Sequence, residues 1–212
     1  MKKHWIAVLL FAALPAAAQT FSVTPSVSTL GYGGSIGARF GVVGLRVMGN
    51  TGSYSRDFQK EDIKFNGKLK LNNVGGIVDL YAGGGFHVSG GIFSNKNHVD
   101  LISDKNQIIT VNGRPYPAAL IGYVTGQATV SKNSPYAGIG WGHSGKGIGL
   151  TFDVGALYHG SPKLAVQAHP TQPALVPASF YADLEAERAK TENDIRSYKY
   201  HPVVTIGLTF GF

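Results

Sequence analysis

Two histidine–serine pairs are the places where this sequence could carry out hydrolytic chemistry. His87 and Ser89 lie two residues apart, and His143 is followed directly by Ser144. A serine nucleophile needs a histidine within hydrogen-bond reach and an acidic partner behind that histidine. Residues i and i+2 of a strand share one face, so a strand would place His87 beside Ser89. The elements around these residues decide whether a substrate can reach them.

Other chemical motifs are weaker. His98, Asp100 and Asp104 could offer metal ligands, but a loop rich in polar residues usually just faces water. The Gly83-Gly84-Gly85 run predicts a tight turn rather than a phosphate-binding loop, because a strand and not a helix follows it. The absence of cysteine excludes disulfides and thiolate metal sites. We therefore expect no catalytic residue, no metal and no cofactor.

The end of the chain shows what must position these side chains. Every second residue from Tyr200 to Phe212 is apolar, whereas the alternate set, Lys199 to Gly211, is small, polar or charged apart from Val203. Side chains alternate across a strand, so the two faces of this segment meet different surroundings. Aromatic residues bracket the apolar face at both ends, which is typical of a strand that crosses an outer membrane. We expect a lipid-facing strand here.

Six further segments show the same two-faced alternation. They are Thr29–Phe40, Leu45–Met48, Val74–Tyr81, Phe86–Ser94, Tyr136–Gly142 and Gly147–His159. Bacterial barrels have an even number of strands, so we expect an eighth, either at Phe21–Val27 or within Ile108–Val124. Ten strands would result if strand-like pieces of the long loops joined the wall.

One irregularity of the alternation needs an explanation. Leu69 and Leu71 fall on the opposite parity from Val74. A β-bulge inserts one residue and exchanges the two faces of a strand. We therefore predict a bulge near Asn72-Asn73.

The start of the chain has the three parts of a secretory signal peptide. Met1-Lys2-Lys3 is basic, Trp5–Leu14 is apolar, and Ala16-Ala17-Ala18 is a small-residue cleavage site. The apolar run is shorter than the roughly 20 residues that a membrane-spanning helix needs. We expect residues 1–18 to be the signal peptide and residues 19–212 to form one domain. Lipid cannot satisfy an open sheet edge, so this domain is predicted to be a closed antiparallel transmembrane β-barrel in the outer membrane.

The connections between the predicted strands alternate between short and long. Short connections are expected at the periplasmic side and long ones outside the cell. The long ones are roughly Arg56–Lys68, Val99–Val124 and Gly160–Tyr198. Within the last of these, Phe180–Tyr198 has helical spacing and predicts a short helix packed against the barrel rim, with Glu192 and Arg196 spaced as an i,i+4 pair.

The charge of the chain bears on its partners. The formal net charge is +7, from 19 Lys and Arg against 12 Asp and Glu. The basic residues are scattered, without a basic helix or a recognised motif, which argues against nucleic-acid binding. A basic surface could meet lipopolysaccharide phosphates or anionic solutes. We expect outer-membrane lipid and lipopolysaccharide as partners, and a monomer.

The alternation assigns seven polar or charged side chains to the barrel interior. They are Arg39, Arg46, Asp79, His87, Asp153, His159 and His201. The interior of an eight-stranded barrel is narrow enough for side chains to fill, and an unpaired buried charge costs several kcal/mol. The first hypothesis is therefore a polar plug in a protein with a structural or surface-interaction role. Because many inward residues are glycine, a narrow channel for small solutes stays open as the alternative.

The alternation also assigns a set of aromatic residues to the lipid-facing surface, where amphipathic rings suit the headgroup zone. They are Tyr32, Phe86, Trp141, Phe152, Tyr158, Tyr200, Phe210 and Phe212.

The tail from Tyr198 to Leu208, ending in Phe212, resembles the closing strand of small Gram-negative outer-membrane proteins. Three more stretches, Phe86–Ser89, Pro135–Gly142 and Tyr158–Lys163, resemble an uncharacterised group of small proteobacterial barrel proteins with an eight-stranded, OmpA/OmpW-like architecture. The resemblance implies that the barrel-assembly machinery recognises the strand ending at Phe212, and it implies no catalytic residue.

Some small barrels of this kind remove or transfer acyl chains of lipid A, which makes an enzyme the least favoured alternative. His87 and Ser89 face the interior by parity, where an acyl chain does not arrive. The second pair, His143-Ser144, falls in a short connection that is predicted to be periplasmic, far from the lipopolysaccharide leaflet.

Overall fold

The computed structural model describes residues 19–60, 63–103, 108–142 and 145–212. These residues form thirteen β-strands, two α-helices and one 3-10 helix. The expectation of a mainly antiparallel β-sheet chain is confirmed. The predicted signal peptide, residues 1–18, lies outside the described residues, as do Asp104, His143 and Ser144.

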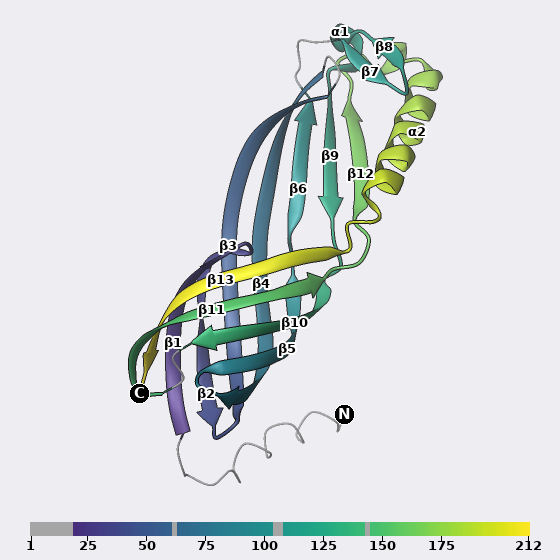
Figure 1. The fold of residues 1–212 in the computed structure, drawn as a ribbon. Helices are drawn as coiled ribbons and strands as arrows, with labels where there is room; N and C mark the ends of the chain where they lie inside the picture. The colour runs from purple at the N-terminus through teal and green to yellow at the C-terminus, as the bar shows by residue number, and fades with distance from the viewer. Residues whose placement is uncertain (1–18, 61–62, 104–107, 143–144) are drawn as a thin grey trace, which may run out of the picture.

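Eight strands pair one after another and return to the first (Figure 1). Their bounds are β1 Gln19–Ser28, β2 Gly31–Phe40, β3 Val43–Lys60, β4 Ile63–Gly83, β5 Phe86–Asn95, β10 Asn133–Gly142, β11 Gly147–Tyr158 and β13 Tyr200–Gly211. Neighbours in the chain pair from β1 to β5; β5 then pairs with β10, β10 with β11, β11 with β13, and β13 with β1. We refer to these eight strands as the strand cycle.

The first of the two positions considered for the missing strand is the correct one. Strand β1 pairs with β2 along its whole length and with β13 at its other edge. Pro25 lies inside β1 opposite Gly34, and residue pairs to β13 are formed at Val23 and Ser26 but not at Pro25. Because proline lacks a backbone N–H, the strand continues through it with one donor fewer.

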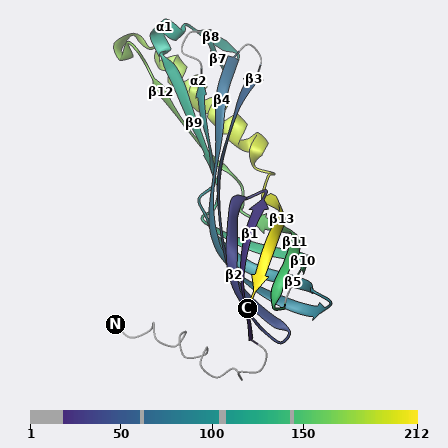
Figure 2. The same cartoon turned by 90° about the vertical axis from the view of Figure 1, so that its left-hand side faces the viewer.

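Strands β3 and β4 continue far beyond the strand cycle and carry the same sheet into a second part of the molecule, here named the extension (Figures 1 and 2). Strand β2 pairs with β3 only as far as Thr51, whereas β3 and β4 pair from Val43 to Lys60. The upper part of β4 pairs with β6 (His98–Ser103), β6 with β9 (Tyr123–Thr129), and β9 with β12 (Lys163–His169). The long connections are therefore largely ordered sheet, and their strands lengthen the extension instead of joining the strand cycle.

The predicted bulge near Asn72-Asn73 is wrong. The register between β3 and β4 runs without a shift from Val43 opposite Leu80 to Lys60 opposite Ile63. Leu71 is 3% exposed, whereas Val74 is 54% exposed. Within the strand cycle, the apolar residues of β4 such as Val74 lie on the outer, exposed face. In the part of β4 that enters the extension, apolar residues such as Leu71 lie on the opposite face, which is buried there. One uninterrupted strand thus passes through two different surroundings.

A small hairpin and two helices complete the extension. They are β7 (Ile109–Val111), β8 (Arg114–Tyr116), α1 (Ala118–Ile121) and α2 (Ala178–Ile195), with a 3-10 turn at Pro173–Leu175. Their shared core contains Ile109, Val111, Tyr116, Ile121, Val124 and Phe180. No helix in the described part of the chain is long and apolar enough to cross a membrane.

Helix α2 falls where a helix was predicted, but its contacts differ. Its main contacts are with β12 and β7 of the extension. Glu192 pairs with Arg188 at 2.8 Å instead of with Arg196. Glu192 also accepts a hydrogen bond from the Leu164 N–H at 3.0 Å, and Arg188 donates to the Leu164 carbonyl. Side chains of α2 thereby satisfy backbone groups at the edge of strand β12, which β9 leaves unpaired.

Candidate functional site

The inner face of the strand cycle holds a buried ionic cluster centred on Arg46. Its Nε lies 2.6 Å from Asp79 Oδ2, and its Nη2 lies 3.0 Å from Asp153 Oδ1. Asp79 is 0% and Asp153 3% exposed. Strands β3, β4 and β11 each contribute one inward residue, and the guanidinium fork bridges the two carboxylates. The cluster therefore ties together strands that are not all neighbours in the sheet.

His87 and Ser89, on β5, complete the cluster without forming a catalytic dyad. His87 Nε2 lies 2.9 Å from Asp153 Oδ1. The Ser89 hydroxyl donates to Asp79 Oδ1 at 2.6 Å. The two side chains contact different carboxylates, and both are buried. In this geometry Ser89 donates to a carboxylate and not to a histidine.

Arg39 joins the cluster indirectly, through an aromatic ring that the sequence patterns did not indicate. Its guanidinium carbon lies 3.9 Å from the ring centroid of Tyr81, and that ring lies 5.0 Å from the ring of His87. A cavity of about 30 Å³ beside Arg39, Arg46 and Tyr81 has room for about one water molecule.

His159 and His201 lie apart from this cluster, at the end of the strand cycle that meets the extension. His159 Nδ1 is 2.9 Å from the Gly160 carbonyl, and His201 Nε2 is 3.2 Å from the Thr29 carbonyl. Of the seven predicted interior residues, four are joined by direct side-chain contacts, Arg39 is joined through Tyr81, and these two histidines contact backbone groups instead.

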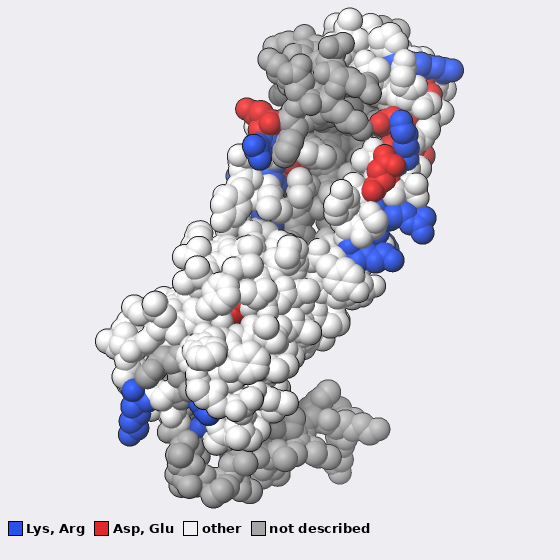
Figure 3. Space-filling model, viewed as in Figure 1, with Lys and Arg blue, Asp and Glu red and all other residues white. Residues whose placement is uncertain are grey.

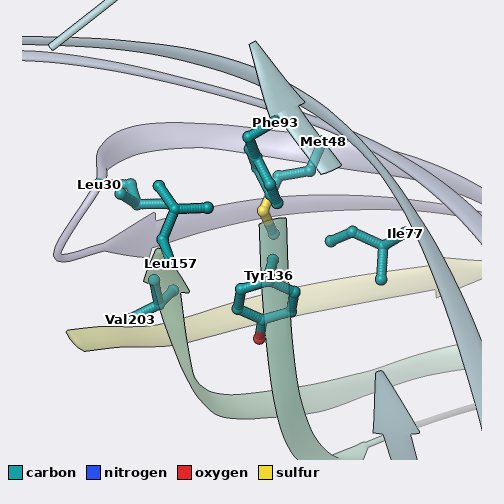
Figure 4. Close-up of a cluster of buried hydrophobic side chains, with 7 residues drawn as sticks. All are labelled: Leu30, Met48, Ile77, Phe93, Tyr136, Leu157 and Val203. Atoms are coloured by element: carbon teal, nitrogen blue, oxygen red, sulfur yellow. The ribbon is translucent and has the colours of Figure 1, made fainter. Parts of the chain in front are cut away.

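A layer of buried apolar side chains lies next to the ionic cluster along the strands, and Figure 4 shows its members. It consists of Leu30, Met48, Ile77, Phe93, Tyr136, Leu157 and Val203, each at most 7% exposed. Along β3, the inward residue after Arg46 is Met48, and along β4 the inward residue before Asp79 is Ile77. The Phe93 and Tyr136 rings meet edge to face, with centroids 5.7 Å apart.

Glycines make room for these rings. A Cβ built on Gly75 would lie 2.5 Å from the ring of Phe93, and one built on Gly155 would lie 2.7 Å from the ring of Tyr136. Inward glycine suggested free space when only the sequence was considered. In the structure, side chains from other positions occupy that space, so the glycines serve the packing of the interior.

A row of asparagines forms a third layer, on the side of the extension. Asn50 lies opposite Asn73, and Asn73 lies opposite Asn95, on three adjacent strands. The Asn95 amide donates to the Ser134 hydroxyl at 3.2 Å. The side-chain amides of Asn50 and Asn73 have no hydrogen-bond partner among the described residues, although both are at least 96% buried. Buried amides of this kind are places where proteins hold ordered water.

The outer face of the strand cycle is apolar and exposed. Tyr32, Trp141, Tyr200 and Phe212 are each more than 60% exposed, while Phe152 and Tyr158 are 46% and 43% exposed. Phe86 and Phe210 are half-buried. A band across β13, β11 and β10 is almost free of charged side chains, which reappear at both ends of it (Figure 3).

Two of the possible metal ligands of the extension, His98 and Asp100, have other partners. Asp100 lies 2.9 Å from Lys70 Nζ and accepts a hydrogen bond from Gln127 at 2.8 Å. The bonds from Gln127 and Lys70 hold the pKa of the Asp100 carboxyl below its usual value. His98 is 3.7 Å away, and the described residues contain no group of three metal-ligating side chains.

No protein-family model and no curated protein matches the sequence. The fold is similar to two crystal structures of Acinetobacter baumannii proteins. CarO is 24% identical, with a TM-score of 0.58 over 91% of this chain and 97% of CarO. CarO2 is 21% identical, with a TM-score of 0.59 over 91% of this chain and 98% of CarO2. At this level of identity the likeness establishes a shared fold.

Proposed function

We propose that the chain is an integral outer-membrane protein whose strand cycle is a closed, eight-stranded β-barrel. The continuous pairing from β1 through β13 and back supports this, because a barrel without edges satisfies its backbone groups within lipid. The exposed apolar residues on its outside, such as Leu150 at 71% and Ile148 at 67%, are suited to hydrocarbon and not to water.

The two ends of the barrel suggest its orientation. Two-residue turns at Gly41-Val42 and Gly84-Gly85 close one end, and the extension rises from the other. In outer-membrane barrels short turns face the periplasm and long segments face outside. The extension is then a cell-surface domain, and the strand ending at Phe212 presents its terminus to the periplasm, where the assembly machinery would recognise it.

The filled interior favours a structural or surface-interaction role over open passage of solutes. The observation that carries this proposal is the stack of an ionic cluster, an apolar layer and an amide row, in which Phe93 is 1% and Asp79 0% exposed. An eight-stranded barrel has a lumen that side chains can fill. The barrel then acts as a rigid anchor that holds the extension at the cell surface.

Planar-bilayer recording of the refolded protein tests this proposal. We expect no unit conductance steps from the wild-type chain. The double variant Phe93→Ala/Tyr136→Ala, which removes both rings of the apolar layer, should stay closed because the ionic cluster still fills the interior, and so should the outward control Leu150→Ala. Reproducible unit steps from the wild type would overturn the anchor proposal in favour of a narrow channel for small solutes. Heat-modifiable migration of each variant in detergent gels checks that the barrel has folded.

A further inference from the structure

Four basic side chains gather where the strand cycle meets the extension, and we name them the basic rim. They are Lys132, Lys163, Arg196 and Lys199. Hydrogen bonds to backbone carbonyls hold the segments that carry these side chains next to one another. The Ser131 N–H donates to the His159 carbonyl at 3.0 Å, and the His159 N–H donates to the Lys199 carbonyl at 2.9 Å. The Ser161 hydroxyl donates to the Arg196 carbonyl at 3.0 Å.

Unlike Lys70 and Arg188 of the extension, the four members of the basic rim have no acidic partner among the described residues. Lys70 is 2.9 Å from Asp100, and Arg188 is 2.7 Å from Glu185. Among the described residues, no ion pair involves a member of the basic rim, and all four members are exposed. Arg196 donates to the neutral amide of Asn193 at 3.1 Å. Four cations are thus available to an external anion.

The basic rim lies at the border of the apolar band. Tyr158 and Tyr200 sit opposite each other on β11 and β13, with ring centroids 5.1 Å apart and both rings exposed. Outward tyrosines of this kind mark the headgroup zone of a membrane. Lys199 directly precedes Tyr200, so the first charges beyond the band belong to the basic rim. Basic atoms are visible there, where the lower end of α2 meets β13 (Figure 3).

We propose that the basic rim binds the phosphates of lipid A in the outer leaflet. This inference rests on the orientation in the proposed function, which places the extension outside the cell. Lysine and arginine form charge-assisted hydrogen bonds to phosphate oxygens. Strands β10, β11 and β13 are consecutive in the sheet, so Lys132 and Lys199, which directly precede β10 and β13, lie on segments about 10 Å apart, a distance that one lipid headgroup can cover. The position beside exposed tyrosines favours a lipid phosphate over a phosphate free in solution.

Binding of a diphosphorylated lipid A to the full chain in detergent micelles tests the proposal. The variant Lys163→Gln/Lys199→Gln should bind about thirtyfold more weakly than the wild type, because each of the two removed cations contributes about 1 kcal/mol near an anionic surface. The matched control Lys68→Gln/Lys190→Gln removes the same charge from exposed positions in the extension and should leave the affinity unchanged. Dephosphorylated lipid A should bind the wild type as weakly as the diphosphorylated form binds the rim variant.

Three results would overturn the proposal: equal affinities for the rim and control variants, equal binding of dephosphorylated lipid A, or competition by millimolar inorganic phosphate that shows a site for free anions. Heat-modifiable migration and insertion into vesicles are measured on the same samples. A rim variant that inserts and folds but binds lipid A like the wild type would reject the basic rim while leaving the barrel proposal intact.

Discussion

Replacing Arg46 with methionine isolates the contribution of the ionic cluster to stability. The guanidinium makes four contacts of 2.6–3.3 Å with the carboxylates of Asp79 and Asp153. Without it, Asp79 keeps Ser89 as a partner and Asp153 keeps His87. Two carboxylates with almost no exposure then remain in the interior without a cation bridging them. Breaking a buried ion pair from one side costs about 3–5 kcal/mol, and we expect Arg46→Met to lower the free energy of unfolding by that amount.

Removing the negative charges as well should reverse most of this loss. Replacing a whole buried ionic group with neutral residues is often close to neutral in stability. We therefore expect the triple variant Arg46→Met/Asp79→Asn/Asp153→Asn to recover to within about 1 kcal/mol of the wild type. The exposed Arg56, on the part of β3 beyond the strand cycle, provides the control. Arg56→Met should change stability by less than about 0.5 kcal/mol.

Equilibrium urea unfolding in lipid vesicles measures these differences. A loss of less than about 1 kcal/mol for Arg46→Met would refute the reasoning, because a buried carboxylate that loses its cation should cost more than that. A triple variant that unfolds as readily as the single variant would refute it in a second way. That result would mean that the packing of the arginine stem, and not its charge, stabilises the barrel.

Two further predictions concern the apolar layer and the extension. Gly75→Val should lower the free energy of unfolding, measured in urea, by about 1–3 kcal/mol, because the new Cβ would meet the ring of Phe93. Gly76→Val should be tolerated, because there is open space where its Cβ would lie. Equal effects of the two substitutions would contradict the packing described. The hydrogen bond from the Tyr116 hydroxyl, with further donors, holds the pKa of Asp183 below its usual value. A depressed carboxyl pKa stabilises the fold above the ordinary pKa and ceases to do so as the pH falls through the depressed value. Hydrogen exchange of α2, corrected for intrinsic rates, should therefore accelerate at acid pH in the wild type and depend less on pH in Asp183→Asn; parallel pH profiles would contradict this.

Seven of the eight strands of the cycle could be predicted from the sequence because each has one apolar and one polar face, whereas β1, which Pro25 interrupts, was one of two candidates for the eighth. Alternation also indicated that Arg46, Asp79 and Asp153 share the inner face, since parity along a strand is independent of tertiary detail. The extension could not be predicted in the same way. Its strands, such as β6 and β12, are six and seven residues long and pair across long sequence separations.

Two errors have a common physical origin. Leu69 and Leu71 suggested a bulge, and the inward glycines suggested free space, because each residue was interpreted in a single, uniform environment. In the structure, β4 passes from one environment to another. The ring of Phe93, on β5, fills the space beside Gly75. The register between strands decides which neighbouring side chain fills the space beside a glycine, and the alternation along one strand does not specify that register.

Lipid contact of Trp141 is the most direct test of the account. Residues 19–212 contain a single tryptophan, because the other, Trp5, precedes them. Its side chain is 62% exposed on the outer face of the strand cycle. We would refold residues 19–212 into vesicles that contain brominated phospholipid. The fluorescence emission of Trp141 should then be blue-shifted and strongly quenched. Emission at the wavelength of water-exposed tryptophan, unaffected by the brominated lipid in a folded chain, would contradict the barrel and everything inferred from it.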